Sequence, residues 1–279
     1  MEMNLQQMQY NFLHYVKINL SDGTYRCYKN HLDYTIKYFN ENKILYSNQI
    51  NLDVLSNFIK YQKNRCVKNS TINKRLKPLK LMYRFNNILN NEIFLQKKLK
   101  EDKKNFPVLS KNEMEKLNNY LLSNKLAFRN VLLIRLLIDT GIRLNELLNI
   151  KVKNINFDTS SIYLDITKTK ESRYVYFTKK TLKLLVEYIL KNKLTKEDKL
   201  FCLTSSGVLS LFYRIKKTLN FIEFHPHMLR HGLATNLNKK GMSVFEIQLI
   251  MGHTNVATTQ RYIHLDQDDI YNKYCQLMN

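Results

Sequence analysis

The chain has 279 residues, of which 44% are hydrophobic and 24% charged, and 45 Lys and Arg against 23 Asp and Glu leave a formal net charge of +22. A charge of this size attracts a polyanion, usually nucleic acid, although an acidic membrane surface would satisfy the charge alone. No uninterrupted apolar run approaches a membrane-spanning length and no amino-terminal signal segment is visible, so we expect no membrane association.

Both halves of the chain are basic. Residues 1–100 hold 17 basic and 6 acidic residues, and residues 101–279 hold 28 and 17. The length fits one large domain or two ordinary ones. The cysteines are Cys27, Cys66, Cys202 and Cys275. Because no two of them form a C-x-x-C pair, we expect free thiols in a reducing compartment, and therefore a cytoplasmic protein.

Residues 1–95 show the apolar spacing of helices and predict a helical domain. Ser21 or Thr24 caps a first helix, whose apolar face comprises Tyr25, Tyr28, Leu32, Ile36 and Phe39. A second helix carries Leu55, Phe58 and Ile59. Residues 71–88 predict another helix, with an apolar face of Ile72, Leu76, Leu79 and Tyr83.

The opposite face of that last helix is basic and comprises Lys74, Lys77, Lys80 and Arg84. A charged face opposite an apolar one is ordinarily just solvated. Here, however, no acidic residue occurs between Thr71 and Asn91. We therefore predict that these four side chains contact DNA phosphates.

Residues 96–109 are rich in lysine and lack sustained apolar periodicity, and they include Pro107. This composition predicts a linker between two domains. Ser110 and Glu113 have the spacing of a capping box, so a second domain is expected over residues 110–279.

Within the second domain, the apolar run 131–138 predicts a buried helix that Gly141 ends, which places Arg143 at the start of the next helix. Strand-like composition occurs in residues 155–157, 162–166 and 174–177. The loop between the last two strands carries Lys168. A further helix is predicted by Leu182, Leu185, Val186 and Ile189.

Residues 225–264 hold five of the seven histidines. Pro226 begins a predicted helix that Gly241 ends, and this places His227 and Arg230 one turn apart on the same side. Singly, a histidine is usually a polar residue satisfied by its neighbours. The concentration of histidines around an arginine indicates a site that binds a phosphate and moves protons.

A second helix follows, opened by the capping box Ser243-Val244-Phe245-Glu246 and ended by Gly252. His253 then lies in a turn. Thr254 or Asn255 caps a third, short helix that carries Tyr262.

A metal site is the alternative for this stretch, because His227 and His231 have the i, i+4 spacing of a ligand pair. No Glu follows His227 as in H-E-x-x-H, and no cysteine lies nearby. We therefore expect neither a metal nor another cofactor.

His-x-x-Arg-His at 227–231, then Gly252-His253, then Tyr262 nine residues later, resembles the C-terminal signature of the tyrosine recombinase (phage integrase) family. Residues 139–147 resemble the box that supplies the family's first catalytic arginine. Residues 166–173 resemble the β-hairpin that carries its catalytic lysine.

The resemblance implies catalytic roles for Arg143, Lys168, His227, Arg230, His253 and the nucleophile Tyr262, with Glu146 and His231 in support. Thr167 and Thr169 stand where many relatives have glycines, so Lys170 remains an alternative to Lys168.

The resemblance also implies a fold: a mainly α, SAM-like N-terminal core-binding domain, and an α+β catalytic domain that is mostly helical with a small antiparallel sheet. Together these close around duplex DNA as a C-shaped clamp. The implied function is site-specific recombination through a 3′-phosphotyrosine, without metal or ATP. The expected working unit is a tetramer on two DNA sites with inverted-repeat half-sites, with a related recombinase or accessory protein as a further partner. The alternatives are a type IB topoisomerase and a DNA-binding protein without catalysis.

Beyond His264 the sequence is first acidic and then places Ile270, Tyr274 and Leu277 on one face, which predicts a C-terminal helix from about residue 266. So short a helix must bury that face, either on its own domain or on a neighbouring subunit. The family often passes this helix to a neighbour.

Overall fold

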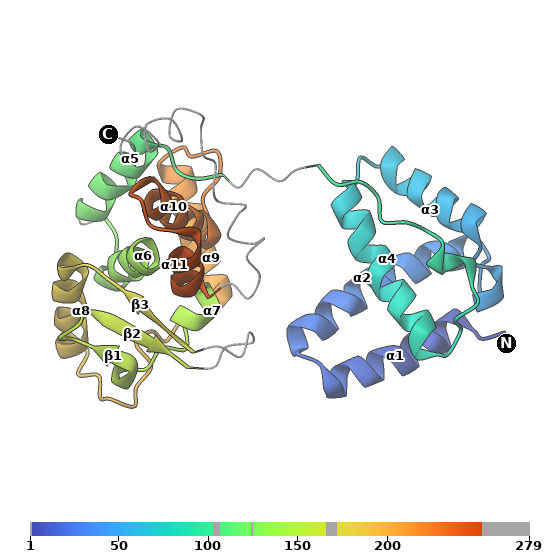
Figure 1. The fold of residues 1–279 in the computed structure, drawn as a ribbon, viewed down its shortest axis with the longest axis horizontal. Coiled ribbons are helices and arrows are strands. Elements are labelled where there is room, and N and C mark those ends of the chain that lie inside the picture. The colour runs from blue at the N-terminus through green and yellow to red at the C-terminus, as the bar shows by residue number, and fades with distance from the viewer. Residues whose placement is uncertain (1, 103–106, 124, 166–171, 253–279) are drawn as a thin grey trace. The chain divides into compact units, whose positions relative to one another are not determined.

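A computed structural model describes residues 2–102, 107–123, 125–165 and 172–252 (Figure 1). Over these residues the chain is mainly helical, with one three-stranded antiparallel sheet, so the fold class expected from the sequence is confirmed. The chain divides into two compact units, Met1–Lys104 and Asn105–Asn279, each with a hydrophobic core of its own.

The described residues of the first unit form four α-helices: α1 (Leu5–Asn19), α2 (Asp22–Glu41), α3 (Leu52–Asn64) and α4 (Asn69–Phe85). Short 3-10 turns lie at Ser47–Gln49 and Glu92–Phe94. Ser21 caps α2 as predicted, because its side chain accepts a hydrogen bond from Thr24 N. The predicted apolar faces meet in the core, where Phe39, Phe58 and Tyr83 are fully buried.

The segment after α4 belongs to the first unit. Asn73 Nδ2 donates to Leu99 O (2.9 Å) and Leu99 N donates back to Asn73 Oδ1 (2.9 Å), while Asn69 Nδ2 donates to Lys100 O (2.7 Å). The first part of the predicted linker is therefore bonded to α4, and the division between the two units, after Lys104, falls within that linker. Amide side chains on α4 satisfy this backbone, and apolar periodicity does not reveal such contacts.

The second unit contains seven α-helices in the described residues: α5 (Lys111–Leu122), α6 (Phe128–Thr140), α7 (Leu144–Leu147), α8 (Lys179–Lys191), α9 (Ser205–Thr218), α10 (Pro226–Lys239) and α11 (Val244–Met251). Its sheet has the order β1 (Ile155–Asn156), β2 (Ser161–Leu164) and β3 (Arg173–Tyr176), with a 3-10 turn at Val152–Asn154 before it. The three strands lie within two residues of their predicted positions.

Helix α6 occupies the centre of the second unit, where it contacts α8, α10 and β3 (Figure 1). It is apolar around most of its circumference, so the consecutive residues Leu132, Leu133 and Ile134, which lie about 100° apart around the axis, are all buried. Helix α9 was not anticipated, although Thr204 caps it and Val208, Leu211, Phe212 and Ile215 follow at helical spacing.

Two glycines end the helices that lead into the candidate site. Gly141 caps α6 with φ +57° and Gly252 caps α11 with φ +60°, both as predicted from sequence. These left-handed turns redirect the chain just before Arg143 and His253. None of the described helices is both long and apolar enough to cross a membrane.

Candidate active site

Arg143 follows the turn that ends α6 and is the N-cap residue of α7. Its Nη1 donates to Glu146 Oε1 (2.8 Å), and its backbone N donates to Glu146 Oε2 (3.1 Å). The Glu146 side chain is 7% exposed, whereas that of Arg143 is 29% exposed. The local capping box thus buries the acid and leaves the guanidinium accessible.

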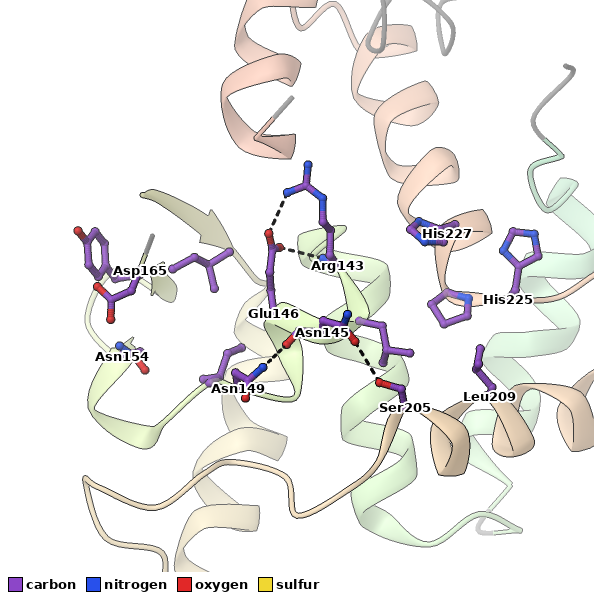
Figure 2. Close-up of a pocket in the computed structure, with 15 residues that line it drawn as sticks. Arg143, Asn145, Glu146, Asn149, Asn154, Asp165, Ser205, Leu209, His225 and His227 are labelled. Atoms are coloured by element: carbon purple, nitrogen blue, oxygen red, sulfur yellow. Dashed lines mark hydrogen bonds and ion pairs between the residues drawn. The ribbon is translucent and has the colours of Figure 1, made fainter. Parts of the chain in front are cut away.

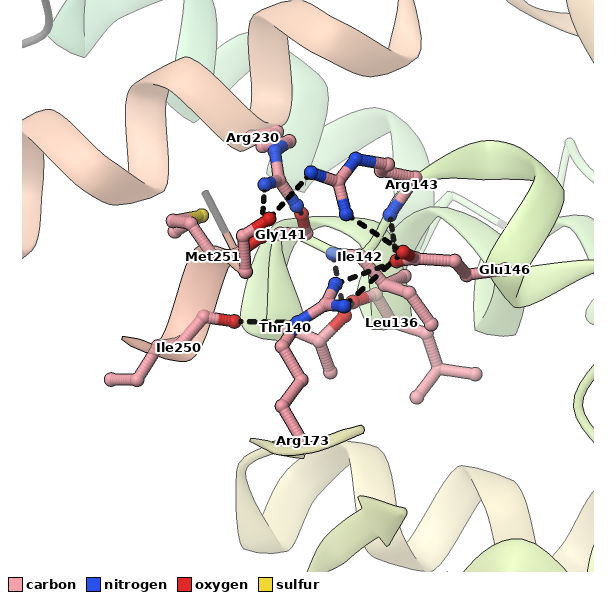
Figure 3. Close-up of polar contacts among 11 residues, drawn as sticks. Leu136, Thr140, Gly141, Ile142, Arg143, Glu146, Arg173, Arg230, Ile250 and Met251 are labelled. Atoms are coloured by element: carbon pink, nitrogen blue, oxygen red, sulfur yellow. Dashed lines mark hydrogen bonds and ion pairs between the residues drawn. The ribbon is translucent and has the colours of Figure 1, made fainter. Parts of the chain in front are cut away.

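Arg230 lies one turn into α10 and is 4% exposed. Its Nη1 donates to Gly141 O (2.6 Å), and its Nη2 donates to Met251 O (Figure 3). One buried side chain therefore connects the end of α6 to the end of α11.

Three arginines converge on the last carbonyls of α11 (Figure 3). Ile250 O accepts from Arg173 Nε (3.0 Å), Met251 O accepts from Arg230, and Gly252 O accepts from Arg143 Nη2 (2.6 Å). The C-terminal carbonyls of a helix lack intrahelical partners and lie at the negative end of its dipole, so guanidiniums suit them well.

Sequence reasoning did not single out Arg173. It occupies an inward-facing position of β3, opposite Leu164 and two residues before buried Val175. A charged residue in an inward register was the available signal, because buried charges occur where they have partners.

Among the described residues of this cluster, positive charge exceeds negative charge. Within the described residues, Glu146 is the acid that pairs with Arg143 and Arg173. Burial opposes ionisation of Glu146, but the hydrogen bonds and charge of Arg173 and the hydrogen bonds of Arg143 outweigh it and lower the pKa of the carboxyl below its usual value. Two guanidiniums on one carboxylate, with Arg230 beside them, are suited to bind an anion such as a phosphodiester.

His227 and Arg143 line the same cavity, which has a volume of about 910 Å³ and also borders Glu146 and His225 (Figure 2). Burial first, and then the charges of Arg230, His225 and Arg143, lower the pKa of His227. The imidazole is therefore neutral at neutral pH, and a neutral imidazole accepts a proton.

His231 lies one turn further along α10, with its ring centroid 6.4 Å from that of His227. It is 6% exposed. Burial, followed by His227, Arg230 and His225, lowers the pKa of His231 to about 4. This neutral ring gives His227 a packed and uncharged support.

The depressed pKa of His231 predicts an acid-sensitive fold. The unfolded chain binds a proton at this residue below its ordinary pKa of 6.5, whereas the folded chain binds it only near 4. The free energy of unfolding should therefore decrease as pH falls from 6.5 towards 4, by up to about 3 kcal/mol for this group. In urea denaturation, His231→Gln should lose that part of the pH dependence and the exposed control His14→Gln should retain it. Equal slopes in both variants would contradict the prediction.

The structure brings together five of the predicted residues: Arg143, Glu146, His227, Arg230 and His231. Lys168, Lys170, His253, Tyr262 and the predicted C-terminal helix lie outside the described residues. In the described chain, no cluster of three or more His, Cys, Asp or Glu side chains is arranged to hold a metal.

The four predicted DNA contacts lie on α4 in the first unit. Lys74, Lys77 and Arg84 are exposed. Lys80 is half-buried and its Nζ donates to Gln96 O, while burial and then the charge of Arg84 lower its pKa. Lys80 therefore bonds to its own chain, and the guanidinium of Arg84 lies 5.4 Å from the centroid of the Phe94 ring.

Comparison with known proteins identifies the class. Residues 107–269 match the phage integrase family, and residues 10–87 match the phage integrase N-terminal SAM-like domain. The chain belongs to the phage integrase family, which confirms the resemblance seen in its motifs.

Individual relatives agree with this assignment. The chain is 42% identical over 151 residues to tyrosine recombinase XerA of Saccharolobus solfataricus, a match covering 54% of this chain and 51% of that protein. It is 26% identical over 297 residues to tyrosine recombinase XerC of Staphylococcus epidermidis, covering 97% and 96%. It is 28% identical over 283 residues to a probable integrase/recombinase of Acholeplasma phage L2, covering 98% and 97%.

Solved structures share the fold. The Tn1549 transposon integrase in complex with transposon right end DNA matches with a TM-score of 0.79 at 19% identity, covering 99% of this chain and 100% of that one. The XerH recombinase bound to its difH substrate matches with a TM-score of 0.70 at 22% identity, covering 89% and 79%.

Proposed function

We propose that this protein is a site-specific DNA recombinase that cuts and rejoins strands through a 3′-phosphotyrosine at Tyr262. The observation that carries the proposal is the arginine cluster, with its surplus positive charge, beside a neutral His227 at an open cavity. Membership of the phage integrase family, and relatives solved with DNA, support the same substrate.

The arginines would hold the phosphate. Charge on a phosphodiester concentrates in the pentacovalent transition state, and guanidiniums remain protonated at any cellular pH and fork onto non-bridging oxygens. Arg143 faces the cavity with 29% of its side chain exposed, which makes it accessible to DNA. Arg230 would act from the buried side, and His253 would donate one more hydrogen bond.

The remaining residues would move protons. A phenol has a pKa of about 10 and attacks poorly unless its proton is removed. His227 would accept that proton as Tyr262 Oη bonds to phosphorus, and Lys168 or Lys170 would protonate the departing 5′ oxygen. The ester energy stays in the phosphotyrosine, so a 5′-hydroxyl from another strand reverses the step without ATP. The guanidiniums supply the charge that a metal ion would otherwise bring.

The first unit would bind the adjacent duplex. Lys74, Lys77 and Arg84 form the exposed part of the basic face of α4 and would contact phosphates, while Lys80 contributes less because it bonds to Gln96. The proposed assembly is a tetramer on two sites, each with inverted-repeat half-sites.

A type IB topoisomerase shares this chemistry, so the function test must detect exchange. Duplexes bound by the protein are first selected from a random library, and two of different length carrying the selected site are then incubated with it in EDTA without ATP. We expect recombinant-length products and an inverted-repeat consensus. Relaxation of supercoiled DNA without recombinant products would indicate a topoisomerase, and binding without either activity would indicate a non-catalytic protein.

A further inference from the structure

We infer that Arg173, the first residue of β3, is a positioning residue for strand cleavage, which holds the Glu146–Arg143 pair and the end of α11 in one arrangement around the phosphate. This inference rests on the proposed cleavage function. It assigns a role to a side chain that need not touch DNA itself.

Arg173 shares one carboxylate with Arg143. Its Nη1 and Nη2 donate to Glu146 Oε1 (3.2 Å) and Oε2 (2.6 Å), so the pair is bidentate. The same Oε1 accepts from Arg143 Nη1 at 2.8 Å, and the same Oε2 accepts from Arg143 N at 3.1 Å. Arg173 thereby fixes the plane of the carboxylate, and the carboxylate in turn orients the guanidinium of Arg143.

The third contact of Arg173 reaches α11. Its Nε donates to Ile250 O (3.0 Å), and the turn at Gly252 packs directly on the guanidinium. A Cβ at Gly252 would lie 2.8 Å from Arg173 Cζ, and its φ of +60° is strained for any L side chain. A glycine at position 252 therefore permits both the left-handed turn and the close approach of Arg173 to the backbone. The next residue in the chain is His253, so Arg173 fixes the point from which the proposed catalytic segment begins.

An arginine suits this position and a lysine does not. The guanidinium is planar and donates in several fixed directions, whereas an ammonium is a point charge. Here the donors serve α7 and α11 from β3, with only 7% of the side chain exposed. An apolar side chain, as at Val175 on the same face, would fill the space at no cost in desolvation. We therefore explain the buried charge of Arg173 by its role in orienting Glu146 and the end of α11.

Removing Arg173 should change the pH dependence of cleavage as well as the stability of the protein. Burial raises the pKa of the Glu146 carboxyl and Arg173 is foremost among the groups that lower it, so the pKa of Glu146 should rise in its absence. A protonated Glu146 accepts fewer hydrogen bonds from Arg143. Cleavage should then decline on the acid side at a higher pH than in the wild-type protein.

The experiment compares Arg173→Met with Arg135→Met, a control that removes a half-buried arginine of the second unit, hydrogen-bonded to Asn118. Single-turnover cleavage of a nicked duplex, half-site Kd and Tm are measured over a range of pH. We expect Arg173→Met to cleave roughly 10- to 100-fold more slowly, a loss typical of residues that orient a reacting group, with Kd within about threefold. The acid limb of its rate should move to higher pH, and adding Glu146→Gln should remove that displacement. Arg135→Met should behave as wild type.

Arg173→Lys keeps the positive charge and provides a second variant if Arg173→Met does not fold. It should fold, bind DNA with the wild-type Kd and recover only part of the cleavage rate. The inference is overturned if a folded Arg173 variant cleaves at the wild-type rate with the wild-type pH profile, or if the displaced limb persists without Glu146. If the wild-type protein itself forms no covalent adduct, both the proposed function and this inference are wrong. A wild-type adduct with unchanged Arg173 variants overturns the inference alone.

Discussion

Tyr262→Phe is expected to abolish covalent attachment to DNA while leaving half-site affinity within a few-fold. The substitution removes one oxygen and keeps the aromatic ring, so it deletes the proposed nucleophile with little change in packing. The measurement is a nicked duplex carrying the selected site, which traps the cleaved strand on the protein and is resolved on a denaturing gel.

The matched control is Tyr213→Phe, which makes the same change on an exposed tyrosine of α9 and should trap DNA like the wild-type protein. An adduct that survives denaturant in Tyr262→Phe would assign the nucleophile to another residue.

Arg143→Gln is expected to lower single-turnover cleavage by roughly 10²- to 10³-fold, the usual effect of removing one preorganised donor to a developing oxyanion. Arg143 is the cleaner of the two proposed phosphate-binding arginines to test, because it is 29% exposed whereas Arg230 is 4% exposed and connects two helix ends. Half-site Kd should change much less, since many phosphates contribute to binding.

Arg129→Gln removes the same charge from an exposed site at the start of α6 and serves as the control. Cleavage by Arg143→Gln close to the wild-type rate would mean that the phosphate is held elsewhere, and the arginine cluster would then be a structural clamp on α11.

The predictable parts of the site are those encoded locally. The capping boxes at Ser110 and Ser243 and the left-handed glycines at positions 141 and 252 follow from spacings of a few residues, and the structure has all four. Because these signals fix where helices begin and end, they also placed Arg143 and Arg230 correctly on their helices.

The contacts that assemble the site are not local. Arg143 reaches Gly252 across 109 residues, Arg173 reaches Ile250 across 77, and Arg230 reaches Gly141 across 89. Hydrophobic periodicity reports which face of an element is buried and carries no information about which distant carbonyl a buried guanidinium meets. Arg173 was missed for this reason.

Polar contacts also bind the first part of the predicted linker to the first unit. The chain after Phe94 looks like a linker because it is rich in lysine, yet Asn69 and Asn73 on α4 hold its backbone. The roles of Lys168 or Lys170, His253 and Tyr262, and the place of the C-terminal helix, stay predictions.

The most direct test of the proposed mechanism is to identify the bond between protein and DNA. The wild-type adduct on a nicked duplex is digested with trypsin and nuclease, and the nucleotide-bearing peptide is fragmented in a mass spectrometer. Cleavage after Arg261 and Lys273 yields a peptide that contains both Tyr262 and Tyr271, so fragmentation must distinguish the two. We expect a nucleotide joined through its 3′-phosphate to Tyr262, with a free 5′-hydroxyl on the released strand. Attachment at any other residue, or through a 5′-phosphate, would contradict it.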